Sequence, residues 1–348
     1  RCRDHIGEQD VEIKTSYIIS AAGPWVDGLR KKDDSLQGKH LFLSKGVHIV
    51  VPHDRFPVRQ AVYFDNTDGR MIFAIPRHRV TYIGTTDTPY QGDLDDIPIE
   101  IQDVNYLLDA TNQMFPGLKL TVEDVESSWA GLRPLIHEEG KSASEMSRRD
   151  EIFESETGLV SLAGGKLTGY RKMAERVVDL IAKRYEAAND NHLPKTITEN
   201  IPLSGGPFAD AEEVGNYRQS LIQPLAAHGL KSYYATYLVA NYGRQSDTIL
   251  ELLRTQFNSQ EQSSEIRLIR AELAFSLENE LVAKALDFLN LRSGRLYFNM
   301  PSVRPSLEVV LQDLASTLGW DADRLTAERA EVEHAIMRCV EFVQAETV

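Results

Sequence analysis

A stretch that combines glycines with a lysine precedes one of the predicted helices. It reads AGGKLTGYR at residues 163–171, and the apolar residues that follow it recur at helical spacing. Exposed amide groups, the positive end of a helix and the ammonium group of Lys166 together favour negative charge on a bound group. The stretch predicts a site at which such charge is stabilised, and the alternative is a glycine turn with a solvated lysine.

A second stretch, WAGLRPL at residues 129–135, fixes the direction of an arginine. Pro134 disfavours the helical conformation for Arg133, so the guanidinium group should leave an extended backbone. A planar guanidinium group held in one direction suits a bidentate contact with a phosphate or a carboxylate. The alternative is a structural arginine that pairs with one of the many acidic residues.

A third stretch, AAGPWVD at residues 21–27, places small residues at the end of a predicted strand. Such residues let a planar or phosphate-bearing ligand approach the backbone, because no branched side chain blocks it. A plain turn is the alternative. The stretch therefore predicts either a turn or a point of close approach to a ligand.

Two histidines are candidates for a general base, because a neutral imidazole accepts protons near neutral pH. His48 is the first candidate and His137 the second. A histidine in a strand, as predicted for His48, is more often structural. For His137 the alternative is an exposed loop residue paired with the neighbouring acids.

The elements that must position these residues are predicted to be strands followed by helices. A strand over 11–22 ends at a Gly-Pro turn, and four strand-like runs between 41 and 84, with DNTDG at 65–69 as a hairpin connection, predict an antiparallel meander. The remaining elements are a helix over 97–115, a strand over 122–129, a hairpin over 151–163 and a helix after 164 whose apolar face includes Met173, Val177, Leu180 and Ile181.

The C-terminal part of the chain is predicted to be helical throughout. Residues 189–206 carry prolines, glycines and asparagines, which indicates a domain boundary. Apolar spacing after it predicts helices over 209–228, 232–241, 245–256, 264–277, 279–291, 305–318 and 321–344.

Composition excludes several classes of protein. The 348 residues include 38 Lys and Arg against 52 Asp and Glu, a net charge of −14, so nucleic acid is an unexpected partner. Cys2 and Cys339 lack metal-like spacing, which favours a reducing compartment and predicts no metal site. No apolar run approaches the roughly 18 residues of a membrane span, and no Gly-x-Gly-x-x-Gly occurs.

The whole chain resembles the FAD-dependent glycerol-3-phosphate dehydrogenases of the respiratory, quinone-linked kind. The resemblance lacks the family's N-terminal strand, Gly-rich turn and helix, so the chain is expected to be the C-terminal two-thirds of such an enzyme. Its matching stretches are AAGPWVD at 21–27, LSKGVHIVVP at 43–52, IGTTDTPY at 83–90, WAGLRPL at 129–135, GKSASEMSR at 140–148, GGKLTGYRKMAE at 164–175 and IPLSGG at 201–206.

The resemblance implies an α/β fold with an all-helical addition. Residues 1–35 and 158–190 would be a remnant of the Rossmann-like FAD-binding domain. Residues 36–157 would form a substrate domain with an antiparallel sheet, of the type shared by D-amino-acid oxidase and glycerol-3-phosphate dehydrogenase. Residues 191–206 would be a linker, and 207–348 the helical C-terminal domain.

The resemblance also implies roles for individual residues. Arg133 and Arg148 match arginines that bind the substrate, His48 matches an active-site histidine that also contacts the substrate, and Lys166 would stabilise the anionic reduced flavin. His48, Arg133 and Lys166 are thus the implied catalytic residues. Where many relatives have Ala-Thr-Gly, this chain has Ala22 in the middle position. The residues implied at the FAD are Ala21, Ala22, Gly23, Trp25, Gly164, Gly165, Lys166, Leu167 and Thr168.

The implied reaction is oxidation of sn-glycerol 3-phosphate to dihydroxyacetone phosphate, with a hydride passing from C2 to flavin N5 and electrons then passing to quinone. One alternative is an oxidase that uses oxygen, but such oxidases carry an extra segment where residues 85–131 run compactly. Others are an amine- or amino-acid-oxidising flavoprotein, which would not need both arginines, and a catalytically incomplete fragment that binds no FAD.

The expected location is cytoplasmic, with quinone implying peripheral contact on the inner face of the cell membrane. The acidic helical part is repelled by anionic lipid, however, and no basic amphipathic helix marks a contact surface. A homodimer is left open.

Overall fold

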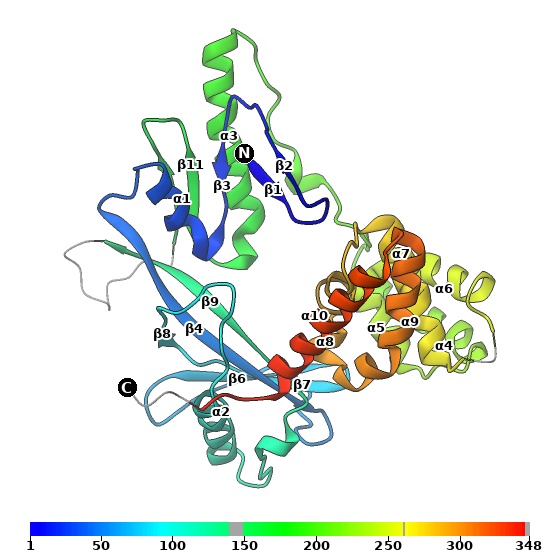
Figure 1. Ribbon diagram of the computed structural model, residues 1–348. Helices are drawn as coiled ribbons and strands as arrows, with labels where there is room; N and C mark the ends of the chain where they lie inside the picture. Colours follow the sequence, from blue (N-terminus) through cyan, green and yellow to red (C-terminus); the bar gives the residue numbers. More distant parts are fainter. Residues whose placement is uncertain (139–148, 260–261, 345–348) are drawn as a thin grey trace. The chain divides into compact units, whose positions relative to one another are not determined.

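The computed structural model describes residues 1–138, 149–259 and 262–344 (Figure 1). Its residues form two compact units. The first unit holds Arg1–Gly46, Asp87–Ile97 and Ala130–Ile201, and the second holds Val47–Thr86, Pro98–Trp129 and Pro202–Val348. Two long strands, β4 (Lys39–Pro52) and β9 (Ser127–Glu138), contribute residues to both units. The predicted domain boundaries stay predictions.

The sheet of the first unit has three strands in the order β10-β11-β3. The predicted hairpin forms β10 (Asp150–Glu154) and β11 (Val160–Gly164), and β11 also pairs in parallel with β3 (Ile19–Ser20). The strand predicted over 11–22 is confirmed only at Ile19–Ser20, where β3 leads into the turn at Gly23–Trp25, and is wrong as one continuous strand. Gln9–Val11 (β2) pairs instead with Cys2–Asp4 (β1). The apolar side chains between β2 and β3 stay exposed, so this segment covers no face of a sheet.

Short turns precede the two helices of the first unit. A 3-10 turn (Gly23–Trp25) leads into α1 (Val26–Lys32), and a second 3-10 turn (Leu167–Gly169) leads into α3 (Tyr170–Asn189). The helix predicted after residue 164 is confirmed but begins only at Tyr170. A short strand, β8 (Thr88–Pro89), pairs with Ser44 and Lys45 of β4.

Four antiparallel strands of the second unit follow the order β5-β6-β7-β4. The meander is confirmed for β5 (Val62–Asp65), β6 (Met71–Arg77) and β7 (Val80–Gly84). It is wrong for β4, which pairs with β7 rather than β5. The link from β4 to β5 is too long for a tight hairpin, whereas only His78 and Arg79 join β6 to β7.

Capping groups set where the next two elements begin. Helix α2 (Ile101–Met114) starts later than predicted, because the side chains of Glu100 and Asp103 cap its first turn reciprocally. The same arrangement at Thr121 and Asp124 forms a 3-10 turn (Val122–Asp124) inside the strand predicted over 122–129. Strand β9 therefore begins only at Ser127 and runs on through the WAGLRPL stretch.

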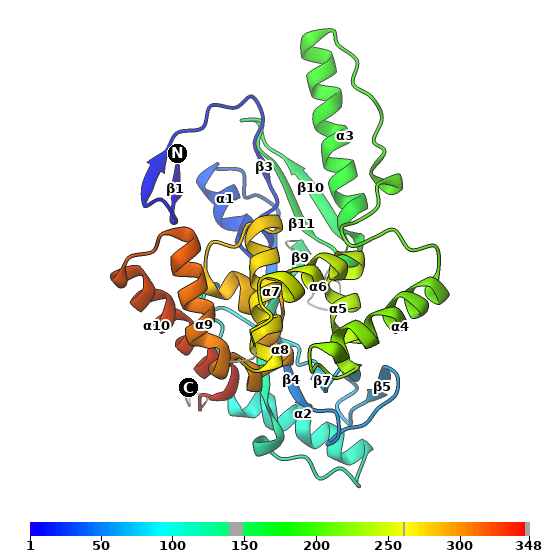
Figure 2. The same ribbon diagram turned by 90° about the vertical axis from the view of Figure 1, so that its right-hand side faces the viewer.

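The predicted helical C-terminal part is confirmed (Figure 2). The helix predicted over 279–291 is replaced by a π-helix (Asp287–Arg292), and the four-residue helix α8 was not predicted. Helix α9 begins before residue 305, where it was predicted to start, and contains Pro305, and α10 ends before residue 344. The helices are α4 (Ala211–Ala227), α5 (Tyr233–Tyr242), α6 (Ser246–Thr255), α7 (Ser264–Asn279), α8 (Arg295–Phe298), α9 (Met300–Leu318) and α10 (Ala322–Val340).

None of the helices in the part of the chain that the structure describes is long and apolar enough to cross a membrane.

Candidate active site

The ends of two parallel strands bring two of the predicted ligand-contacting stretches to one edge of the first unit. The register aligns Ile19 with Val160 and Ser20 with Ser161, so the segments that follow both strands leave the sheet at its carboxyl edge. The turn at Gly23–Trp25 packs against β11. Ligands of open α/β sheets bind at this edge.

The backbone at this edge tolerates only glycine at two positions. Gly164 has φ +75° and Gly165 has φ +82°, in the left-handed region that favours glycine. A Cβ on Gly164 would lie 2.6 Å from the carbonyl oxygen of Arg149, and one on Gly165 would lie 2.9 Å from Cβ of Asp150. Nearby, the Oγ of Ser20 is buried without a hydrogen-bond partner. Both glycines thus let the neighbouring chain pack closely, whereas a Cβ on Gly23 would meet nothing within 4 Å, and the edge also holds an unsatisfied hydroxyl group.

Several side chains along the segments that leave this edge are open to solvent. Trp25 is 46% exposed and Leu167 is 89% exposed, although both are large and apolar. Lys166 and Thr168 are also exposed, and Lys166 makes no ion pair with any residue that the structure describes. These side chains could cover a planar group and place a cation beside it.

Arg133 leaves an extended backbone in β9, as Pro134 predicted. Its guanidinium group lies directly over Gly46 of β4, where a Cβ would come within 2.5 Å of Nη2. Nη1 donates to Oδ1 of Asp87 at 3.4 Å, and the hydroxyl group of Ser44 donates to the same carboxylate oxygen. The arginine is 35% exposed and the aspartate 44% exposed, so this ion pair adds little stability.

His48 lies in the part of β4 that belongs to the second unit, opposite Gly84 of β7. A Cβ on Gly84 would lie 2.3 Å from Cδ2 of the imidazole, so the ring rests on bare backbone. The ring stacks on Trp129 with centroids 4.7 Å apart and planes 9° apart, and Phe73 and Tyr82 pack around it. The imidazole is held in one orientation.

The positions of the two remaining predicted residues, His137 and Arg148, are as follows: one lies in a strand and the other outside the described residues. His137 lies within β9 with its ring 4.9 Å from that of His40, so the alternative of a loop position is wrong. Arg148 lies outside the described residues. Within the described part of the chain, no group of three His, Cys, Asp or Glu residues could hold a metal ion.

Sequence reasoning missed Gly46, Gly84, Asp87 and the stacking role of Trp129. A glycine inside a strand often marks a close approach of another group, and that signal was present at both glycine positions. The partners themselves come from other strands, so local patterns could not identify them.

Two known protein families match the chain. The family described as "FAD dependent oxidoreductase" matches residues 2–171, and the one described as "C-terminal domain of alpha-glycerophosphate oxidase" matches residues 196–325. The fold and its glycine-lined edge agree with the first description. The predicted fold class, a FAD-binding α/β part with an antiparallel sheet and a helical C-terminal domain, is confirmed.

Individual relatives narrow the assignment. The aerobic glycerol-3-phosphate dehydrogenases of Bacillus subtilis and Staphylococcus haemolyticus are both 42% identical, over 91% and 93% of the chain, which spans 57% and 58% of their lengths. The glycerol-3-phosphate dehydrogenase of Bacillus halodurans complexed with FAD has a TM-score of 0.84 at 42% identity, over 99% of this chain and 66% of that one. The chain belongs to the FAD-dependent oxidoreductases, within the family of the glycerol-3-phosphate dehydrogenases.

The carboxyl edge of the first unit fits the flavin that this family uses. A Cβ on Gly23 would meet nothing within 4 Å, so the backbone of that turn is open to a ring. The hydroxyl group of Ser20 is available as a polar contact, and exposed apolar side chains flank the turns. Lys166 adds positive charge where a reduced ring carries negative charge. Among the residues that the structure describes, no feature of this edge conflicts with FAD.

Proposed function

We propose that this chain forms the substrate-binding and flavin-facing part of an enzyme that oxidises sn-glycerol 3-phosphate to dihydroxyacetone phosphate. The chain spans less than two thirds of its curated relatives, which carry this activity in their names. The proposal depends on the position of the Arg133 guanidinium group, which packs against the backbone of Gly46 and donates a hydrogen bond to Asp87. A fixed, partly exposed guanidinium group is suited to the phosphate that distinguishes this substrate from glycerol.

The proton of the reaction is assigned to His48. Oxidation at C2 removes the hydroxyl proton and a hydride from carbon, leaving a carbonyl group. The neutral imidazole accepts the proton, and its stacking on Trp129 fixes the direction of its nitrogen atoms. FAD, when bound, supplies the acceptor for the hydride.

The glycine-lined edge of the first unit is assigned to the flavin ring. Ala21, Ala22, Gly23 and Trp25 follow one strand, and Gly164 to Thr168 follow the other. In this proposal the open backbone at Gly23 lets the ring approach, and Lys166 stabilises its negative charge when reduced. Arg148 is proposed as a second phosphate ligand on the resemblance alone.

The FAD pyrophosphate is proposed to be held by residues outside these 348, because the sequence contains no Gly-x-Gly-x-x-Gly turn. The visible spectrum of the purified 348-residue chain tests this proposal. A colourless chain that gains no protein-bound flavin when FAD is added is expected, whereas stoichiometric FAD on the isolated chain would contradict it.

Quinone is the proposed electron acceptor, in line with the aerobic dehydrogenases among the relatives. The name of the C-terminal family favours a second candidate, an oxidase that passes the electrons to oxygen. Parallel assays of quinone reduction and of hydrogen peroxide formation separate the two. Faster turnover with quinone than with oxygen is expected, and the reverse would identify an oxidase.

Substitution of Arg133 tests the phosphate assignment in the FAD-loaded enzyme. We expect Arg133→Ala to lower kcat/KM for glycerol 3-phosphate by about 100-fold or more, since a hydrogen bond to a charged group is lost in binding and in the transition state. Flavin content should stay unchanged. Arg133→Lys should recover part of the loss, because the lysine restores the charge but not the bidentate geometry. Unchanged kcat/KM in Arg133→Ala would refute the assignment.

A further inference from the structure

One indole ring in the second unit contacts both the His48 imidazole and the helical part of the chain. Trp129 stacks on His48 and also packs against two aromatic rings of α8. Its centroid lies 5.3 Å from that of Tyr297 and 5.5 Å from that of Phe298, the latter edge to face. The C-terminal helices therefore reach the His48 imidazole through Trp129, and Tyr82 forms a second, looser link, since its ring lies 6.5 Å from that of His48 and 6.0 Å from that of Phe298.

The backbone just before Trp129 is fastened to the same helices. Ser127 donates from Oγ to the carbonyl oxygen of Tyr297 at 2.5 Å, and Ser128 donates from Oγ to the carbonyl oxygen of Cys339 in α10 at 2.8 Å. Both serines are at most 1% exposed, so water does not compete for these bonds. The position of Trp129 is thus set by its own packing and by the hydrogen bonds of the two residues that precede it.

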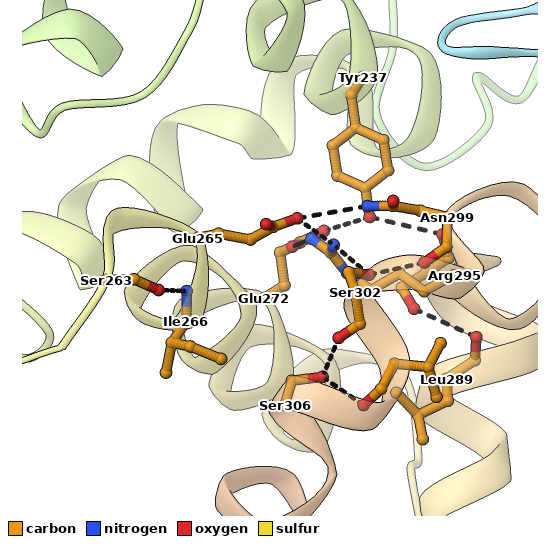
Figure 3. A network of polar contacts seen from close by, with 12 residues as sticks. Tyr237, Ser263, Glu265, Ile266, Glu272, Leu289, Arg295, Asn299, Ser302 and Ser306 are labelled. Carbon is orange, nitrogen blue, oxygen red and sulfur yellow. Dashed lines mark hydrogen bonds and ion pairs between the residues drawn. The ribbon is translucent and has the colours of Figure 1, made fainter. Parts of the chain in front are cut away.

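Helix α8 is only four residues long, but a buried network holds it (Figure 3). Arg295 at its start forms an ion pair with Glu272 of α7, and neither side chain is exposed. The hydroxyl group of Tyr237 donates to the same glutamate at 2.6 Å, and Arg295 donates to Ser302 of α9 at 3.3 Å. At the other end of α8, the guanidinium group of Arg77 lies 3.9 Å above the ring of Phe298. The helix that carries Tyr297 and Phe298, the two aromatic residues that contact Trp129, is therefore held at both ends.

We propose that Trp129 is a positioning residue for His48, and that the C-terminal helices support the reaction through Tyr297 and Phe298. This inference rests on the proposed function, in which His48 accepts the substrate proton. The imidazole has bare backbone at Gly84 close to it and the indole stacked on it, so the ring has little freedom to rotate. A base that keeps its orientation spends more of its time within reach of the proton.

Kinetics of the FAD-loaded enzyme test the inference. We expect Trp129→Leu to lower the rate of flavin reduction at saturating glycerol 3-phosphate by about 10- to 100-fold, as for a misplaced catalytic group, with little change in KM. Trp129→Phe keeps a ring and should retain most of the rate. Trp320→Leu is the matched control and should leave the rate unchanged. This tryptophan packs against the core of the C-terminal helices, but among the described residues its ring contacts neither Trp129 nor the rings of Tyr297 and Phe298.

The deciding comparison uses His48→Asn as a background. If Trp129 acts through His48, Trp129→Leu should cost nothing further once the imidazole is absent. The same fold-loss in both backgrounds, or an unchanged rate in Trp129→Leu alone, would overturn the inference. Full activity in His48→Asn would instead refute the proposed base. If Trp129→Leu loses its flavin or precipitates, Phe298→Leu replaces it in the same two backgrounds, because this substitution removes a ring that packs against Trp129.

Discussion

Two glycines lie directly beneath the side chains that the proposed reaction needs. Gly46 lies under the guanidinium group of Arg133, and Gly84 lies beside the imidazole of His48. Neither has a positive φ angle, so both are required for space and not for backbone freedom. In each strand the missing side chain lets a polar group from elsewhere settle against the backbone.

Gly84→Ala should displace the imidazole, because the new Cβ would overlap Cδ2 and Nε2 of His48. We expect turnover of the FAD-loaded enzyme to fall by about 10- to 100-fold, the usual cost of moving a catalytic group by an ångström. Steady-state kinetics with glycerol 3-phosphate measures the loss. Gly117→Ala is the control, since its Cβ would meet nothing within 4 Å. Equal activity of both variants would show that the space at Gly84 is not needed.

At this scale the sequence predicts conformation better than contacts. Pro134 is a neighbour of Arg133 in the chain, so the extended backbone of the arginine could be predicted. The seat of its guanidinium group on Gly46, 87 residues earlier in the numbering, depends on which strands lie side by side. The stacking of His48 on Trp129 depends on the pairing of β4 with β9, so it could not be predicted from local sequence either.

The boundaries of helices and strands depend on short-range signals that compete with packing. Capping by Glu100 and by Thr121 moved the starts of α2 and β9 to later residues than periodicity indicated. Most of the strand expected over 11–22 does not form, because its alternating apolar residues cover no sheet and stay exposed. Pro305 lies inside α9 although it suggests a helix start.

The ion pair between Glu272 and Arg295 joins α7 to α8 where water is excluded. Burial raises the pKa of the Tyr237 and Tyr242 hydroxyl groups well above their usual value, so both stay protonated and donate to Glu272. A single carboxylate thus accepts hydrogen bonds from one guanidinium group and from two hydroxyl groups. The pair holds the helix from which Tyr297 and Phe298 extend.

Glu272→Gln should lower the free energy of unfolding by about 3–5 kcal/mol, since it leaves the buried Arg295 guanidinium group without its main counter-charge. Urea unfolding measures the change. The matched control is Glu251→Gln, which removes one partner of the exposed pair with Arg254 and should leave stability nearly unchanged. Equal effects of the two substitutions would contradict the role given to the buried pair.

At the scale of the whole molecule, the net charge of the chain is opposite in sign to the charge of the residues proposed to bind the substrate. The chain carries a net charge of −14, yet the proposed substrate is an anion and the residues proposed to bind it are cations. A few fixed positive groups can dominate the potential of a site whatever the total charge. Apolar spacing correctly predicted the helical C-terminal part. The bounds of the two compact units are not visible in local patterns, because β4 and β9 each supply residues to both.

The central claim is that the enzyme oxidises glycerol 3-phosphate and recognises it through its phosphate. Anaerobic mixing of the FAD-loaded enzyme with sn-glycerol 3-phosphate, and separately with glycerol, tests this claim most directly. The visible absorbance of the oxidised flavin reports the reaction. We predict that glycerol 3-phosphate bleaches the flavin completely and that glycerol at the same concentration does not. An unbleached flavin with glycerol 3-phosphate, or equal rates with both alcohols, would contradict the claim.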